Sequence, residues 1–267
     1  MLAQPMLIGF SVIAVVAQEP RVPPGLSSPS GVAIALLGPG VDYRVPEVAR
    51  SLSRDGEGDL IGWDFTDNDI KPFSETGPGT AAAISLVSLA PQSQLVIIKE
   101  RPGDPQSLGH MITFVARTPT RIVVWLDADP NRLDWPILAK AVRSFGDRLF
   151  VIPGGDGGRD LDASSAYNDI RGAANVIITT SSASDANRGK STVDMTIASP
   201  RGALPFASRD AALVVAAIAA RALAKEGRRS MANLKQLIIQ PPPNGIATRP
   251  GYMTAAQANA TFTANRD

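Results

Sequence analysis

The sequence has 267 residues, with 26 Lys and Arg against 25 Asp and Glu, so its formal net charge is +1. A nearly neutral chain has no overall electrostatic attraction to nucleic acid or to anionic membranes. Hydrophobic residues make up 44% of the chain and charged residues 19%, which suits a folded core and excludes global disorder. The lack of Cys and the single His exclude disulfides, Cys nucleophiles and Cys/His zinc sites, and leave His110 as the one candidate imidazole.

The N-terminal region carries a short apolar run, MLIGFSVIAVVA, over residues 6–17. The run ends in small residues before the first charge, Glu19, which is typical of the hydrophobic segment and cleavage site of a secretory signal. No Lys or Arg precedes Arg21, so a truncated gene start or an N-terminal strand remains an alternative. The run is too short to span a bilayer. We interpret residues 1–17 as a signal peptide or apolar N-terminal segment and the Pro- and Ser-rich residues 18–30 as a linker, and we expect a secreted or periplasmic protein.

From about residue 31 onward, apolar runs alternate with helical patterns. The near-continuous apolar runs predict strands that are buried on both faces, at 32–37, 95–99, 122–126, 149–152 and 175–180. The helical patterns predict helices at 45–52, 80–89, 107–117, 135–145 and 208–225. This alternation indicates a parallel sheet with crossover helices. Because the sequence has no internal repeat and no stretch of clearly different composition, we predict one α/β domain over 31–267.

Five segments carry recognisable motifs near the ends of these strands. They are VAIALLGPGVDYRVPEV (32–48), GWDFTDND with GPGTAAAISL (62–86), LAPQSQLVIIK (89–99), IVVWLDADP with LFVIPGGDGG (122–158), and NVIITTSSASD with VDMTIASP and LPFASRDAALVVAAIAARAL (175–223). In this order the segments resemble the strand ends and loops of the subtilisin-like serine peptidases. The resemblance implies a subtilisin-like three-layer α/β fold, with a mostly parallel central sheet and helices on both faces.

The resemblance also places unsuitable residues at the family's catalytic positions. In that mechanism a Ser attacks the carbonyl, a His takes its proton, an Asp orients the His, and an Asn helps to bind the oxyanion. Here Gly38 stands at the position of the Asp and Pro78 at that of the His. Gly155 stands at the position of the Asn, or Asp156 after a one-residue shift, and Pro205 stands at the nucleophile. The resemblance therefore implies a degenerate member that lacks peptidase chemistry.

Two further residues are candidates to replace the missing general base and nucleophile. His110 falls within the predicted helix 107–117, away from the strand ends, so we interpret it as an ordinary helix residue and not as a general base. Ser208 follows Pro205 by about one turn and has no matched base, which favours a packing or helix N-terminal role.

Two Gly-rich stretches raise the question of phosphate or nucleotide binding. Gly38-Pro39-Gly40, followed by Asp64, partly matches a dinucleotide fingerprint, but Tyr43 stands where the third Gly belongs and Pro39 lacks an N–H. The run GGDGGRD (154–160) could cradle an anion through its amides, although a loop left by a degenerate oxyanion region is the favoured interpretation. We predict no cofactor.

An acidic loop, DFTDND, places Asp64, Asp67 and Asp69 at the alternating spacing of a Ca²⁺ loop. A solvated acidic loop explains the same pattern, so calcium is the lesser interpretation and no metal is predicted. Aromatic residues make up only 5% of the chain and no stacking platform for bases is apparent, so we expect no nucleic acid partner.

These observations favour a pseudopeptidase that binds a peptide or protein partner in the former substrate groove. The resemblance places Leu126, Asp127, Ala128 and Asp129 along that groove, opposite residues 100–105. We expect both segments to present unpaired backbone groups, a template for an extended peptide. A diverged hydrolase with unidentified catalytic residues, and a structural domain with a collapsed groove, remain alternatives.

Overall fold

The computed structural model describes residues 19–25, 30–75, 77–101, 103–104, 106–128, 135–198, 207–227, 229–239 and 252–253. Its strands are β1 (Ala33–Gly38), β2 (Gly62–Asp64), β3 (Gln94–Lys99), β4 (Ile122–Trp125), β5 (Leu149–Pro153), β6 (Val176–Ser181), β7 (Met195–Ile197) and β8 (Tyr252–Met253). Its helices are α1 (Pro46–Ser51), α2 (Pro78–Leu89), α3 (Ser107–Val115), α4 (Trp135–Ser144), α5 (Ser208–Glu226) and α6 (Met231–Ile239), and η1 (Leu161–Ala163) and η2 (Ser165–Tyr167) are short 3₁₀ helices.

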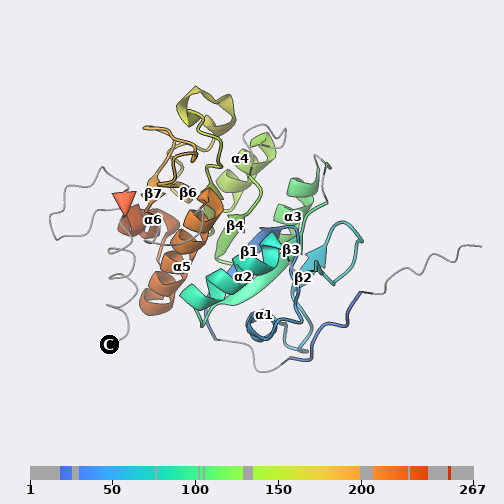
Figure 1. Ribbon diagram of the computed structural model, residues 1–267. Helices are drawn as coiled ribbons and strands as arrows, with labels where there is room; N and C mark the ends of the chain where they lie inside the picture. The colour runs from blue at the N-terminus through green and yellow to red at the C-terminus, as the bar shows by residue number, and fades with distance from the viewer. Residues whose placement is uncertain are drawn as a thin grey trace, which may run out of the picture.

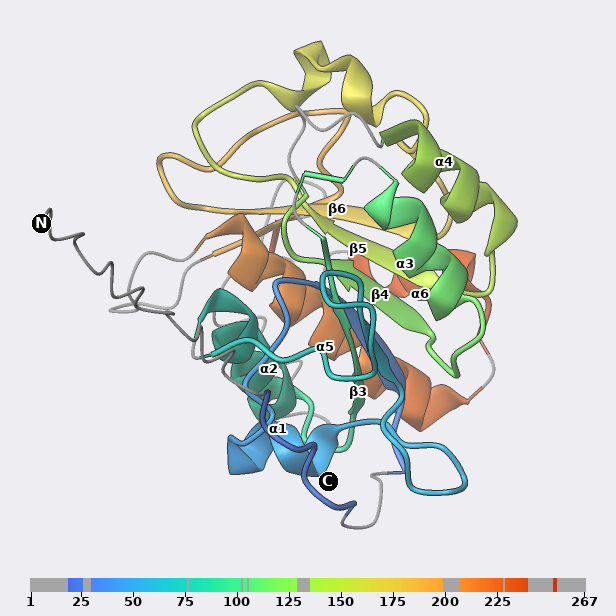
Figure 2. The same cartoon turned by 90° about the vertical axis from the view of Figure 1, so that its right-hand side faces the viewer.

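The described strands form one parallel sheet in the order β2-β3-β1-β4-β5-β6-β7-β8. Figures 1 and 2 show α3 and α4 on one face of this sheet and α2 and α5 on the other. The predicted fold class, a three-layer α/β arrangement with a parallel central sheet, is therefore confirmed. None of the described helices is both long and apolar enough to cross a membrane.

The strands β1, β3, β4, β5 and β6 each divide their side chains between two hydrophobic clusters, one on each face of the sheet. In β1, Ile34 and Leu36 pack in the cluster on the α2 and α5 side, whereas Ala35 and Leu37 pack in the cluster on the α3 and α4 side. Because both faces are covered, successive positions are all buried, and this produces the continuous apolar runs in the sequence.

Helix α6 was missing from the sequence-based prediction. Its apolar residues Met231, Leu234 and Ile238 form a narrow stripe at i, i+3 and i+7, which is a weak signal in a nine-residue helix. The helix is held by Lys235, whose Nζ lies 2.7 Å from Oδ1 of Asp194 in a largely buried ion pair.

Residues 19–25, within the predicted linker, run along the loops that follow β1 and β2. The Tyr43 hydroxyl donates a hydrogen bond to the carbonyl oxygen of Pro20 (2.6 Å), and the Arg54 guanidinium donates one to Pro23 (2.6 Å). Burial raises the pKa of the Tyr43 phenol to about 12. The described part of the linker is thus extended but held against the domain, while the predicted signal peptide and residues 26–29 lie outside the described residues.

The glycine-rich loop after β5 is bound by a segment that follows β6. The N–H groups of Gly157 and Gly158 both donate to the carbonyl oxygen of Asp185, at 2.6 and 2.7 Å. Further along, the Asp162 carboxylate accepts hydrogen bonds from the backbone N–H groups of residues 190–192, at 2.8 to 3.2 Å. These two glycine amides are used within the chain, which leaves them unavailable as an anion cradle.

The Asp162 contacts predict a pH-dependent contribution to stability. Partial desolvation raises the pKa of this carboxyl, but hydrogen bonds from Thr192, Ser191 and Lys190 outweigh it and lower the pKa from 3.8 to about 2. Because the folded-state pKa lies below the ordinary value, the stabilisation is present at neutral pH and is lost as the pH falls through this interval.

We expect Asp162→Asn to lower the free energy of unfolding by about 1 kcal/mol at neutral pH, with the difference from wild type shrinking in acid. Urea unfolding at pH 7 and near pH 3 measures this. Asp169→Asn is the control, since Asp169 is exposed and has no hydrogen bond or ion pair among the described residues. An equal loss at both pH values would contradict the assignment.

Candidate functional site

Segments that are far apart in the sequence meet at the carboxyl edge of the sheet. The turn after β1 contacts the start of α2 so closely that a Cβ on Gly79 would stand 2.0 Å from the carbonyl oxygen of Gly40. The Asp42 N–H donates to Oγ1 of Thr80 (2.8 Å) across the same contact. Position 79 therefore requires glycine, and the neighbouring Pro78 is the first residue of α2, beside the turn that contains Gly40.

Asp42, in the turn after β1, is paired with a neighbouring side chain. Asp42 is buried, and its two carboxylate oxygens accept hydrogen bonds from Nε and Nη2 of Arg44, at 2.9 and 2.7 Å. The side-chain hydrogen bonds from Arg44 lower the pKa of Asp42. This carboxylate is thus ionised and paired, and it orients no imidazole.

Gly38, the last residue of β1, faces the side chain of Leu126. A Cβ at position 38 would stand 3.2 Å from both Cβ and Cδ1 of Leu126, which is itself buried. The space in which an Asp side chain would extend is therefore occupied by an apolar group.

The start of α5 is bound to the loop that follows β5. Ser208 is fully buried, and its Oγ lies 2.7 Å from the carbonyl oxygen of Gly155 and 2.9 Å from Oδ1 of Asp156. The backbone N–H of Ser208 also donates to that carboxylate (3.2 Å), so Asp156 caps the helix. Gly155 has a φ of +78°, a conformation that favours glycine. Pro205 lies outside the described residues.

The next residue of α5 reaches the segment after β4. Arg209 Nη2 lies 2.6 Å from Oδ1 of Asp127, and Arg209 Nε donates to the carbonyl oxygen of Leu126 at 3.4 Å. The two charged side chains are 34% and 38% exposed. One of the predicted groove carboxylates is therefore already paired within the chain, while Asp129 lies outside the described residues.

The segment after β3 corrects one expectation from the sequence. The Glu100 N–H donates to Gly38 (2.7 Å), and the Glu100 carbonyl accepts from the Thr66 hydroxyl (3.1 Å). The Arg101 N–H donates to Oγ of Ser107 (3.1 Å) at the start of α3. The prediction of unpaired backbone groups in this segment is wrong at these two residues, because the chain turns directly into a helix whose first side chain binds it.

The segment after β4 is only partly paired. The Leu126 N–H donates to the carbonyl oxygen of Leu37 (2.8 Å), which continues the sheet pairing by one residue. Within the described part of the chain, the backbone groups of Asp127 and Ala128 make no hydrogen bond. These two residues are the part of the predicted groove that still offers a template.

His110 lies in a different part of the molecule. Its ring stacks on Phe65, with ring centroids 6.2 Å apart and planes inclined by 21°, and it lines a cavity beside β2. Among the described residues, the Ser208 hydroxyl has Gly155 and Asp156 as its partners. His110, the one His in the sequence, is therefore not a partner of Ser208.

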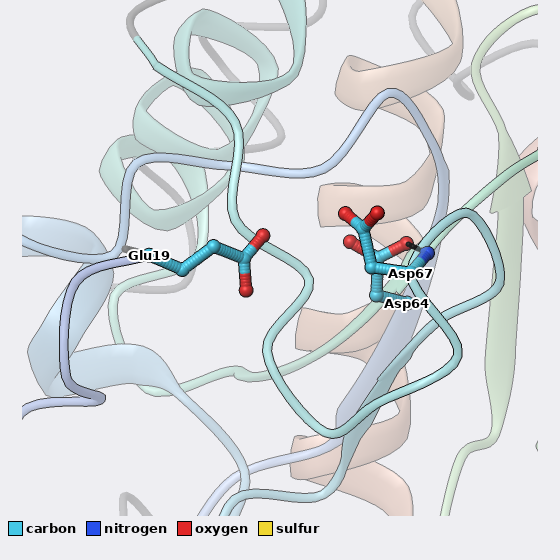
Figure 3. Close-up of side chains that lie close together, drawn as sticks. All are labelled: Glu19, Asp64 and Asp67. Atoms are coloured by element: carbon cyan, nitrogen blue, oxygen red, sulfur yellow. Dashed lines mark hydrogen bonds between the residues drawn. The ribbon is translucent and has the colours of Figure 1, made fainter. Parts of the chain in front are cut away.

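The predicted calcium candidates lie beside the N-terminal segment. Asp64 is fully buried, and Lys99 Nζ lies 2.7 Å from its Oδ2 and 3.4 Å from Oδ2 of Asp67. The Glu19 carboxylate points toward the same group from residues 19–25 (Figure 3). Desolvation, followed by repulsion from Asp69, raises the pKa of Glu19. The three carboxylates are close enough to share a cation, but the Lys99 ammonium already supplies positive charge to two of them.

Comparison with solved structures shows several with the same architecture. The chain is similar to a lanthipeptide protease (TM-score 0.63, 14% identity, 87% of each chain) and to a chain of the subtilase cytotoxin SubAB structure (TM-score 0.63, 15% identity, 88% of this chain and 89% of that one). It is also similar to a cold-adapted subtilisin-like serine proteinase (TM-score 0.60, 19% identity, 78% and 80%). At these identities the likeness establishes the subtilisin-like fold alone. The sequence matches no protein-family model and no curated protein.

The contact between Gly38 and Leu126 predicts a coupling between the two positions. We expect Gly38→Asp to lower the free energy of unfolding by about 1–3 kcal/mol, because its side chain enters space that Leu126 fills. Leu126→Ala opens that space, so the double variant should lose less than the sum of the two single losses. Urea unfolding of the four proteins measures the coupling.

Gly56→Asp is the matched control for this prediction, since nothing lies within 4 Å of the position of a Cβ at Gly56. It measures the cost of the Gly-to-Asp change itself. Strictly additive losses for Gly38→Asp and Leu126→Ala would show that Leu126 does not occupy the space.

Proposed function

We propose that this chain, which has the subtilisin-like fold, is a catalytically inactive domain that acts by binding a peptide or protein partner at the former substrate groove. The observation that carries the proposal is the start of α5, where Ser208 and Arg209 are both bound by residues of neighbouring loops. We also propose that the domain works outside the cytoplasm, on the basis of the signal-like residues 6–17.

Inactivity is supported by the hydrogen bonds of Ser208. A serine nucleophile needs a base within hydrogen-bond reach that can take its proton. Ser208 is buried and has a carbonyl oxygen and a carboxylate as partners, and neither arrangement exposes Oγ to a substrate. The helix N-terminus is also unsuited to an oxyanion, because its N–H binds Asp156 and that carboxylate would repel a second negative charge.

Binding is supported by the end of β4. The backbone groups of Asp127 and Ala128 are free among the described residues, so an extended chain could pair with them as an added strand. The ion pair between Asp127 and Arg209 lies beside them and is about one-third exposed on each side, which places both signs of charge within reach of a partner.

A structural role without a ligand is the second candidate function. It is favoured by the pairing of Glu100 and Arg101, which leaves one edge of the former groove without a template. A diverged hydrolase is less well supported, because the described Ser208 hydroxyl that lies 2.9 Å from the Asp156 carboxylate is fully buried and faces no substrate.

The absence of turnover is the first expected outcome. The purified protein should neither cleave casein nor react with a fluorophosphonate probe, under conditions in which an active subtilisin does both. Pro205→Ser should remain inactive, because the members of a catalytic triad act as a unit. Stoichiometric labelling that a single Ser→Ala substitution abolishes would overturn the proposal and establish an enzyme.

The binding role is tested by reversing the charges of one ion pair. We expect Asp127→Lys to weaken binding of a basic or neutral partner and to change the melting temperature little, because a pair this exposed is worth about 1 kcal/mol or less. Quantitative pull-downs from secreted and periplasmic fractions, with a melting curve for each variant, measure both effects.

The variant Asp127→Lys combined with Arg209→Asp restores an ion pair with its charges exchanged. If binding stays weak while stability recovers, the loss belongs to recognition and not to folding. Recovery of the same partners by all three proteins, or of none, would favour the structural role.

A further inference from the structure

A cavity of about 850 Å³ lies beside β2, the edge strand of the sheet, on the face that carries α3. This edge is on the right in Figure 1 and faces the viewer in Figure 2. Helix α3 contributes His110, Thr113 and Phe114, which lie on one side of the helix at i, i+3 and i+4, and Arg117 lines the cavity from the turn that follows α3. Gly38, Pro78 and Gly155 do not line the cavity, so it is separate from the site proposed above.

Four aromatic rings form a continuous wall in this cavity. The ring centroids of Phe114 and Trp63 are 6.1 Å apart, and those of Trp63 and Phe65 are 6.4 Å apart. The Phe65 ring stacks on His110, with 6.2 Å between the centroids. Trp63, Phe65 and Phe114 are each only half-buried, and Ile70 at the rim is 50% exposed. Apolar surface gathered in a hollow and left in contact with water favours an apolar ligand that covers it.

The charged side chains that line the cavity differ in whether they already have hydrogen-bond partners. The Asp55 carboxylate accepts hydrogen bonds from two backbone N–H groups of its own turn (2.9 Å each), and Asp104 accepts one from Gln106 (2.8 Å). Arg101 donates to the carbonyl oxygen of Thr66 (3.3 Å). Among the described residues the Arg117 guanidinium has no hydrogen bond and no ion pair. Of the Asp and Arg side chains that line the cavity, Arg117 is therefore the one that has no hydrogen bond within the described part of the chain.

We propose that this cavity binds a small planar aromatic carboxylate. The ring system lies against Trp63, Phe65 and Phe114, and the carboxylate pairs with the fork of N–H donors on Arg117. The volume falls within the range of about 300–1,000 Å³ for small-molecule sites, and such sites combine an apolar lining with a few polar groups that orient the ligand.

The test uses 2-naphthoate as the probe and 2-naphthylmethylamine as its match, with the same ring and the opposite charge. Calorimetric titration should show saturable binding of naphthoate, about tenfold or more tighter than that of the amine. Tryptophan fluorescence gives a second readout, because Trp125 and Trp135 are buried while Trp63 lines the cavity. Binding should quench a component of the fluorescence that Trp63→Phe removes.

Three variants separate the roles of the wall and the cation. Arg117→Gln should reduce naphthoate binding to the level of the amine, whereas Phe114→Ala should weaken both probes. Arg143→Gln, which changes an exposed arginine of α4 outside the cavity, is the matched control and should leave both affinities unchanged. Because Arg117 is exposed, its variant keeps the test valid even if Phe114→Ala disturbs folding, which a melting curve reports.

The proposal is overturned if naphthoate shows no saturable binding to the full chain, or if it binds the Arg117→Gln variant as tightly as the wild type. Equal binding of the two probes would also overturn it, since the cation would then have no part in recognition. None of these outcomes bears on peptidase activity or on the groove beside Asp127.

Discussion

The burial of the strands β1, β3, β4, β5 and β6 on both faces is the constraint on which the rest of this molecule depends. Successive residues of β1, such as Leu36 and Leu37, pack into separate clusters on opposite faces of the sheet, so neither face of the central strands is open to a ligand. Parallel strands also bring all their carboxyl ends to one edge, where the loops after β1, β4 and β5 meet. The chemistry of this fold is consequently confined to that edge and to the outermost strand.

At the carboxyl edge, residues of the chain itself fill the space and pair the buried polar groups. A buried polar group needs a hydrogen-bond partner, since each unmade hydrogen bond costs about 1–3 kcal/mol. Leu126 fills the space beside Gly38, and Asp156 satisfies both the hydroxyl and the N–H of Ser208. The Asp156 contacts link α5 to the loop after β5, and the Leu126 contact links the segment after β4 to the end of β1.

The outermost strand presents the opposite situation. β2 has a neighbour on one side only, and its Trp63, together with Phe65 just after the strand, lines a hollow beside α3. On its other face, Asp64 is fully buried but is neutralised by Lys99 from β3. The charged pair therefore anchors this strand to the sheet, while the aromatic wall of the cavity keeps apolar surface that the domain itself does not cover.

The five buried strands at the centre of the sheet could be predicted from the amino-acid sequence, whereas β2, β7 and β8 were not predicted. The predicted strands agree with β1, β3, β4, β5 and β6 to within one residue at each end, because burial on both faces leaves a local signal that needs no partner to be recognised. The residues Gly38 and Pro78 could likewise be placed from their motifs, at the end of a strand and the start of a helix. Short helices with a weak apolar stripe, such as α6, could not be predicted from the same signal.

Which polar side chains are paired depends on contacts between distant segments, and the three-dimensional structure is needed to see them. Ser208 meets Asp156 and Arg209 meets Asp127 across 52 and 82 residues of chain, and no local pattern encodes such pairs. The hydrogen bonds that Glu100 makes with Thr66 and Arg101 makes with Ser107 also depend on how the segments pack, as does the cavity lined by Arg117. A side chain's hydrogen bonds depend on which loops the crossover helices bring together, whereas its burial in a strand depends mainly on its immediate neighbours. That difference separates what the sequence predicted from what it could not.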